Sequence, residues 1–351
     1  MAANVHKVSR FMDRRSFLSA AIAGASTFGV SSAFAQSLVP CESVSDLHIP
    51  SMSLVDAVAI IESTTMYDDE ERLPAFRAIQ SAIDAVNRKE PYSDFLAGGL
   101  DLSKAEISRF FSEMPVLDLY DRAFDKVLRE FSDAKVTGSP MVWYVYNMGI
   151  LVKTSTCAFS IDLCHRKAPL LAPMLDFALC THNHGDHYTQ AFFKAMRGNP
   201  IITNFYLCPK WYRSDFESEL QIGDVTVRCT SVDHNKYLPL AVLCFEVVCG
   251  KGENPFVIFH SGDACNASQM KTVTPHPDLF FGHTAIGFNF LEAAKTTMPA
   301  KLLMPVHHQE LGHLGGPWRC VAFEDEPLKI VHQLRAEGFS SALPVWGDRV
   351  C

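Results

Sequence analysis

The chain has 351 residues and a formal net charge of −8, and 48% of its residues are hydrophobic. That apolar share is enough to build a sizeable core, so an intrinsically disordered chain is excluded. The acidic balance argues against non-specific nucleic-acid binding, which depends on Lys and Arg, and we expect no nucleic-acid partner.

The N-terminus has the pattern of an export signal. An arginine pair at 14–15 precedes an apolar stretch of small residues, and an A-x-A cleavage pattern falls at 33–35. We predict that residues 1–35 are a signal peptide for the twin-arginine export machinery, which would make the mature protein periplasmic or secreted. An uncleaved anchor is the alternative, but a membrane span needs about 20 apolar residues. We expect no permanent membrane span.

Residues 36–136 are predicted to form a helical extension. Apolar residues recur three or four apart in two runs, 73–86 and 117–131, as on one face of a helix. Ser103 and Glu106 have the spacing of a capping box, which predicts a helix that begins after Ser103. We expect these helices to pack as a layer on the following domain. A lid over the active site is the alternative.

From 137 to 351 the pattern changes to short apolar runs separated by polar turns, which is typical of buried strands. The predicted strands are 141–146, 176–180, 225–229, 241–249, 256–259 and 301–304. A helix is predicted at 189–196, between two of them. Strands mixed with helices in this way predict an α/β domain whose sheets are covered by helices.

The densest group of possible metal ligands is His182, His184, Asp186 and His187, which directly follows the apolar run at 176–180. Imidazole and carboxylate groups are the usual ligands of Zn²⁺ and related divalent ions. Side chains this close in sequence can converge at the end of one strand, whereas histidines that merely packed would each need a separate hydrogen-bond partner. A metal site is therefore the preferred interpretation.

This His-x-His-x-Asp-His motif resembles the metal signature of the metallo-β-lactamase superfamily. Three later residues match the rest of that family's pattern in order: His234, Asp263 and His307. Asp162 resembles the family's early strand-end aspartate, which orients the site without binding metal. The resemblance covers about residues 141–310 and implies an αββα sandwich of the metallo-β-lactamase type at 137–351, with the helical segment as an N-terminal extension.

The resemblance further implies a pair of divalent metal ions. The implied ligands of the first ion are His182, His184 and His234. Those of the second ion are Asp186, His187 and His307. Asp263 is implied to bridge both ions. Zn²⁺ is the expected metal, and Mn²⁺ or Fe²⁺ also suit these ligands. Asp186 is expected to be catalytic as well, by orienting a water or moving its proton. His308 and His313 flank the last ligand and are candidates for substrate binding.

The implied activity is metal-dependent hydrolysis of a small-molecule substrate. Segments 281–294 and 304–307 are most similar to the L-ascorbate-6-phosphate lactonase-like branch, which implies a lactone or other carboxylic ester cleaved by a hydroxide that bridges the metals. A phosphodiesterase at the same metal pair is the alternative. Aspartate instead of cysteine at Asp263 weighs against a β-lactamase, and the complete ligand set weighs against a non-catalytic metal-binding protein.

Overall fold

The computed structural model describes residues 52–86, 90–196, 198–205, 218–284, 287–312 and 327–351. The predicted signal peptide and His313 lie outside these ranges, so the expectations about them stay predictions. No helix within the described ranges is both long enough and apolar enough to cross a bilayer.

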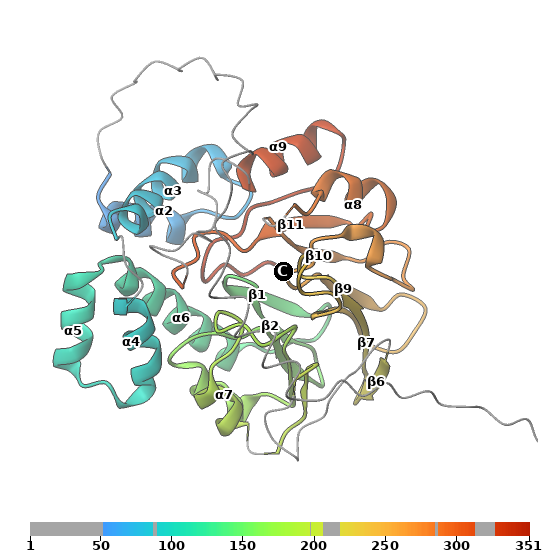
Figure 1. Ribbon diagram of the computed structural model, residues 1–351, viewed down its shortest axis with the longest axis horizontal. Coiled ribbons are helices and arrows are strands. Elements are labelled where there is room, and N and C mark those ends of the chain that lie inside the picture. The colour runs from blue at the N-terminus through green and yellow to red at the C-terminus, as the bar shows by residue number, and fades with distance from the viewer. Residues whose placement is uncertain (1–51, 87–89, 197, 206–217, 285–286, 313–326) are drawn as a thin grey trace, which may run out of the picture. The chain divides into compact units, whose positions relative to one another are not determined.

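The described strands form two sheets (Figure 1). Sheet A contains, in spatial order, β1 (Met141–Tyr146), β2 (Gly149–Lys153), β3 (Ala158–Ile161), β4 (Phe177–Leu179) and β5 (Ile201–Ile202). The first three strands pair antiparallel, whereas β3, β4 and β5 pair parallel. The carboxyl ends of β3 and β4 therefore lie at the same edge of this sheet.

Sheet B runs in the order β11-β10-β9-β8-β7-β6. Its strands are β6 (Ser218–Ile222), β7 (Val225–Val232), β8 (Val242–Cys249), β9 (Phe256–His260), β10 (Leu279–His283) and β11 (Leu302–Val306). Strands β7 and β9 are both antiparallel to β8, and β9, β10 and β11 are mutually parallel. The carboxyl ends of β7, β9, β10 and β11 thus meet at one edge.

The described α-helices flank these sheets (Figure 1). They are α2 (Leu54–Ser63), α3 (Asp69–Asp84), α4 (Glu90–Gly98), α5 (Lys104–Glu113), α6 (Val116–Asp133), α7 (Gln190–Ala195), α8 (Phe290–Thr296) and α9 (Pro327–Ala336). The capping box predicted for α5 is present: the Ser103 hydroxyl accepts from the backbone N–H of Glu106, whose carboxylate accepts from the backbone N–H of Ser103. Helices and sheets belong to one unit, Ser51–Cys351.

Alternate residues of sheet B pack in opposite directions, as the pleat of a strand requires. Phe245 and Phe281 belong to a core that they share with sheet A and the N-terminal helices. Phe280 and Leu303, on the other face, pack in a second core with Leu334 of α9. Helices α8 and α9 therefore cover one side of sheet B and sheet A lies on the other, which confirms the predicted αββα sandwich.

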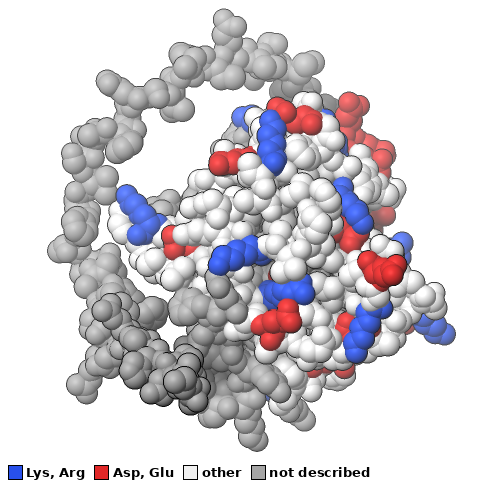
Figure 2. All heavy atoms as spheres, turned by 90° about the vertical axis from the view of Figure 1, so that its right-hand side faces the viewer, with Lys and Arg blue, Asp and Glu red and all other residues white. Residues whose placement is uncertain are grey.

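The predicted elements agree well with the observed ones. The predicted strands correspond to β1, β4, β7, β8, β9 and β11, with strand ends that differ by up to three residues, and the predicted helix at 189–196 corresponds to α7. The two helical apolar runs fall on α3 and α6. On the face of the molecule in Figure 2, basic and acidic side chains are interspersed over the described surface, without one continuous basic patch.

A buried ion pair ties the N-terminal helices to the end of the chain. Arg72 of α3 is fully buried, and its guanidinium donates to both carboxylate oxygens of Asp348, at 2.7 and 3.0 Å. Asp348 in turn lies beside β1, the edge strand of sheet A, because its carbonyl accepts from the backbone N–H of Tyr144. This contact fixes α3 against the last residues of the chain.

Replacing Arg72 with methionine is expected to lower the free energy of unfolding by about 3–5 kcal/mol, because Asp348 would stay buried without its cation. Urea denaturation measures the change. The double variant Arg72→Met/Asp348→Asn should recover part of the loss, and Arg109→Met, at an exposed position of α5, serves as the control. A loss no larger than that of the control would show that the pair does not hold α3 in place.

Candidate metal centre

The seven predicted ligands all follow the carboxyl ends of strands. His182, His184, Asp186 and His187 lie in the loop between β4 and α7, His234 follows β7, Asp263 follows β9, and His307 follows β11. The loop is anchored at its far end by Thr189, whose hydroxyl caps α7 by accepting from the backbone N–H of Phe192. Strand ends from both sheets therefore bring together residues that are far apart in sequence.

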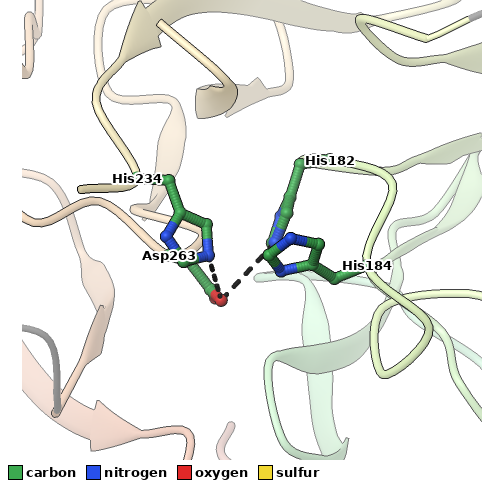
Figure 3. Close-up of side chains that lie close together, drawn as sticks. All are labelled: His182, His184, His234 and Asp263. Carbon is green, nitrogen blue, oxygen red and sulfur yellow. Dashed lines mark ion pairs between the residues drawn. The ribbon is translucent and has the colours of Figure 1, made fainter. Parts of the chain in front are cut away.

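The first group contains His182, His184, His234 and Asp263, whose possible ligand atoms all lie within 4.8 Å of one another. The Nε2 atoms of His182 and His234 are 3.5 and 3.4 Å from Oδ2 of Asp263. In Figure 3 the imidazoles reach toward the Asp263 carboxylate from two different parts of the fold. The structure thus brings together the residues implied for the first ion, with Asp263 beside them.

The second group contains Asp186, His187 and His307. The Nε2 atoms of His187 and His307 are 3.4 and 3.3 Å from Oδ2 of Asp186. Asp263 also reaches this group, because its Oδ1 is 3.2 Å from Nε2 of His187 and its Oδ2 is 3.7 Å from Nε2 of His307. The carboxylate of Asp263 therefore lies between the two groups, as a bridging ligand would.

Hydrogen bonds on the outer side of the imidazoles orient them. Nδ1 of His187 is 2.9 Å from Oδ2 of Asp162, and Nδ1 of His182 is 3.0 Å from the hydroxyl of Thr181. Asp162 also accepts from the backbone N–H and hydroxyl of Thr181. Partners of this kind fix a ligating histidine and leave its other nitrogen directed at the metal. Asp162 thus takes the orienting position that the resemblance implies.

The inner atoms of the cluster fit divalent cations. Nε2 of His182, His187 and His234 and Oδ1 of Asp263 are buried and make no hydrogen bond within the described part of the chain. A buried polar atom without a hydrogen bond costs about 1–3 kcal/mol. Four such atoms converging on one place are explained when they bind a cation, and imidazole nitrogen with carboxylate oxygen is the donor set of Zn²⁺, Mn²⁺ and Fe²⁺.

The electrostatics of the cluster favour metal binding. Burial, with a contribution from His234, lowers the pKa of His184 to about 4, which keeps this imidazole neutral. Burial acts to raise the pKa of Asp263, but His187 and His307 hold it well below its usual value. Burial acts to lower the pKa of His187, yet Asp263 and Asp186 raise it well above its usual value. His187 therefore has to release a proton when it binds a metal ion.

Unusual backbone conformations gather around this centre. Asn147, Asp162 and His307 have φ of 57°, 48° and 67°, a left-handed region that residues other than glycine seldom adopt. Asn147, in the turn between β1 and β2, donates from its amide to Oδ2 of Asp186 at 2.8 Å. The sequence did not indicate Asn147, because it belongs to no motif and its partner is 39 positions away. Such conformations cluster at functional sites.

Other histidines near the cluster have different surroundings. His308 is fully buried with its ring against Tyr144, and burial lowers its pKa to about 3. The contact between His308 and a substrate stays a prediction. His260 is also buried: its Nε2 donates to the carbonyl of Met148, and its Nδ1 accepts from the backbone N–H of Gly262 next to Asp263. His283, which the sequence did not assign to the metal ligands, lies inside the cluster.

The fold and the site together define a class: an α/β sandwich with a buried histidine–aspartate cluster at the strand ends. No protein-family model matches the sequence, and no curated protein matches it. A possible metal-dependent hydrolase from Veillonella parvula is 14% identical over 61% of this chain and 99% of its own, with a TM-score of 0.45. The metallo-β-lactamase-fold protein YhfI from Bacillus subtilis is 15% identical over 60% of this chain and 98% of its own, with a TM-score of 0.41. The diiron β-hydroxylase CmlA from Streptomyces venezuelae is 12% identical over 76% of this chain and 61% of its own, with a TM-score of 0.46.

Proposed function

We propose that this chain is a metal-dependent hydrolase that binds two divalent ions and cleaves a small lactone or other carboxylic ester. The observation that carries the proposal is the position of Asp263. Its Oδ2 is 3.4 Å from Nε2 of His234 in the first group, and its Oδ1 is 3.2 Å from Nε2 of His187 in the second. A carboxylate shared in this way would hold two cations close enough to act on one substrate.

Two divalent ions in this cluster would make a water nucleophilic at neutral pH and stabilise the negative charge that develops on an ester oxygen. Asp186 is the residue best placed to take the proton of that water. Its Oδ2 accepts a hydrogen bond from the amide of Asn147, which fixes the direction of the carboxylate. Of the predicted ligands, His184 alone is only partly buried, and its neighbours Asn183 and Gly185 are exposed. We infer that the substrate enters from this side.

The charges around the centre favour an ester over a phosphodiester. Among the described residues, the largest electrostatic influences on His184, Asp186 and Asp263 come from neighbouring histidines and aspartates, and not from lysine or arginine. A phosphodiester carries a permanent negative charge that proteins usually bind with Arg or Lys. A carboxylic ester is neutral at the reacting carbonyl and needs no such partner.

Protein purified without chelator is expected to contain about two divalent ions per chain, a number that elemental analysis measures. The ion content should fall as the pH is lowered, because protons compete for the ligands and His187 binds its proton tightly in the absence of metal. Metal binding at constant pH should therefore release protons, which calorimetry in buffers of different ionisation enthalpy detects. Protein that binds no divalent ion even after incubation with Zn²⁺, Mn²⁺ or Fe²⁺ would overturn the proposed function.

The substrate class is tested with one panel of lactones, linear carboxylic esters, phosphodiesters and β-lactams, assayed on the metal-loaded protein. We expect the highest kcat/KM for a lactone or ester, and loss of turnover when a chelator removes the metal. Preferential turnover of phosphodiesters would favour the alternative that the sequence left open. A loaded protein that hydrolyses none of the four classes would argue against hydrolysis as its function.

A further inference from the structure

His283 is the last residue of β10 and occupies a defined place in the metal centre. Its Nε2 is 3.8 Å from Oδ1 of Asp263, and its ring centroid is 4.1 Å from that of His307. Asp263, His283 and His307 offer ligand atoms that all lie within 4.8 Å of one another, a spacing that a single metal ion can bridge. The side chain is 2% exposed, so a charged or polar partner has to be provided by the protein or by a bound ion.

The backbone fixes this side chain at the centre. His283 lies opposite Val306 in the parallel pairing of β10 with β11, which puts it beside His307 at the end of the neighbouring strand. Its backbone N–H donates to the hydroxyl of Ser261 at 3.1 Å, two residues before Asp263. The position of His283 relative to both residues is thus set by the sheet and does not depend on a flexible loop.

Two nearby buried histidines have different contacts. Nε2 of His260 donates to the carbonyl of Met148, and His308 lies with its ring against Tyr144. Neither belongs to a group of possible metal ligands within the described residues. His283 differs from both, because its Nε2 is directed at the carboxylate that the two metal groups share.

We propose that His283 is an additional ligand of the second metal ion. This proposal rests on the proposed function, because it requires the metal pair. The second ion would then have five protein donors, namely Asp186, His187, Asp263, His283 and His307, whereas the first has four. Zn²⁺ is most often four-coordinate in proteins, while Mn²⁺ and Fe²⁺ prefer more ligands. The two positions therefore differ in metal preference: the first suits Zn²⁺, and the second suits Mn²⁺ or Fe²⁺.

The test compares the whole protein with His283→Ala and His283→Gln, using His276→Ala as the matched control. His276 is exposed and its ring contacts the carbonyl of Pro299, away from the cluster. Metal-free protein is titrated with Co²⁺ in competition with a chelator, and the visible absorption of each bound ion is recorded. Circular dichroism of the metal-free proteins identifies any variant that fails to fold. The glutamine variant keeps a polar side chain of similar size if alanine is not tolerated.

We expect the wild type and His276→Ala to bind two ions with the same pair of affinities. Both His283 variants should keep the affinity of the first ion and bind the second at least about 10–100-fold more weakly. The second Co²⁺ should also absorb more strongly in the variants, because Co²⁺ with fewer ligands absorbs more strongly than Co²⁺ with five or six. Unchanged affinities and spectra in a folded variant would overturn the role of His283. A wild type that binds no metal would instead overturn the proposed function itself.

Discussion

Replacing Asp263 with alanine is expected to bring the metal content below about one ion per chain and to abolish measurable turnover. The reason is that one carboxylate serves both groups: Oδ2 faces His182 and His234, while Oδ1 faces His187. Without this carboxylate, several imidazoles would surround the two cations with one anionic ligand, Asp186, instead of two. Mutation of a residue that only hydrogen-bonds to a metal ligand lowers the metal affinity roughly 10–100-fold, so loss of the ligand itself should weaken the binding of each ion at least as much.

Elemental analysis and the apparent metal affinity are measured for Asp263→Ala and for Asp94→Asn, a control at an exposed position of α4. The control should keep both ions and full turnover. Because the removal of a buried carboxylate leaves His187 and His307 without that partner, circular dichroism has to show that the metal-free variant still folds. An Asp263→Ala protein that still binds two ions would show that the carboxylate does not bridge the groups.

The sequence predicts the parts of the centre that are local or that follow strands in a recognisable order. His182, His184, Asp186 and His187 lie close together in the chain, so their convergence needs only a strand end and a turn. Distant ligands such as His234 cannot be joined to this loop by spacing alone, and the family pattern supplied them. The sheet edge explains why the pattern works, because strands of both sheets end at the centre.

The residues that the sequence did not assign to the metal centre depend on contacts that no local pattern encodes. His283 is a single histidine at the end of an apolar run, and only the register of β10 with β11 puts it beside His307. A search for every histidine at a strand end would have found it. Asn147 gives no such signal. Strand β6 is likewise weakly marked, because it is an edge strand whose residues are only partly buried or exposed.

His308 shows how two neighbours in sequence can face in different directions. It directly follows the ligand His307, which made it a candidate for substrate contact. The left-handed backbone at His307, with φ of 67°, is not the regular extended strand of β11. The chain turns there, and His308 is directed into the core against Tyr144 while His307 faces the metal cluster.

Replacing Asp186 with asparagine is expected to reduce turnover by about 10²- to 10⁴-fold or more, and to reduce turnover more than metal content. The amide of Asn147 donates to Oδ2 of Asp186, the same oxygen that lies 3.4 and 3.3 Å from Nε2 of His187 and His307. An asparagine held by that hydrogen bond would keep its carbonyl oxygen toward the second group and place its NH₂ where Oδ1 was. It would therefore remain a weak ligand, but it would lose the negative charge and the ability to take a proton.

The measurement is kcat and metal content on the same preparations, against the best substrate of the panel. The first ion should stay bound, because His182, His184, His234 and Asp263 are unchanged, and the content should fall from about two ions toward about one. Asn147→Ala provides the matched comparison: it keeps the carboxylate but removes its orienting hydrogen bond, so kcat should fall while both ions stay bound. If Asp186→Asn turned over substrate at a rate near the wild type, Asp186 would have no part in proton transfer and would be a metal ligand alone.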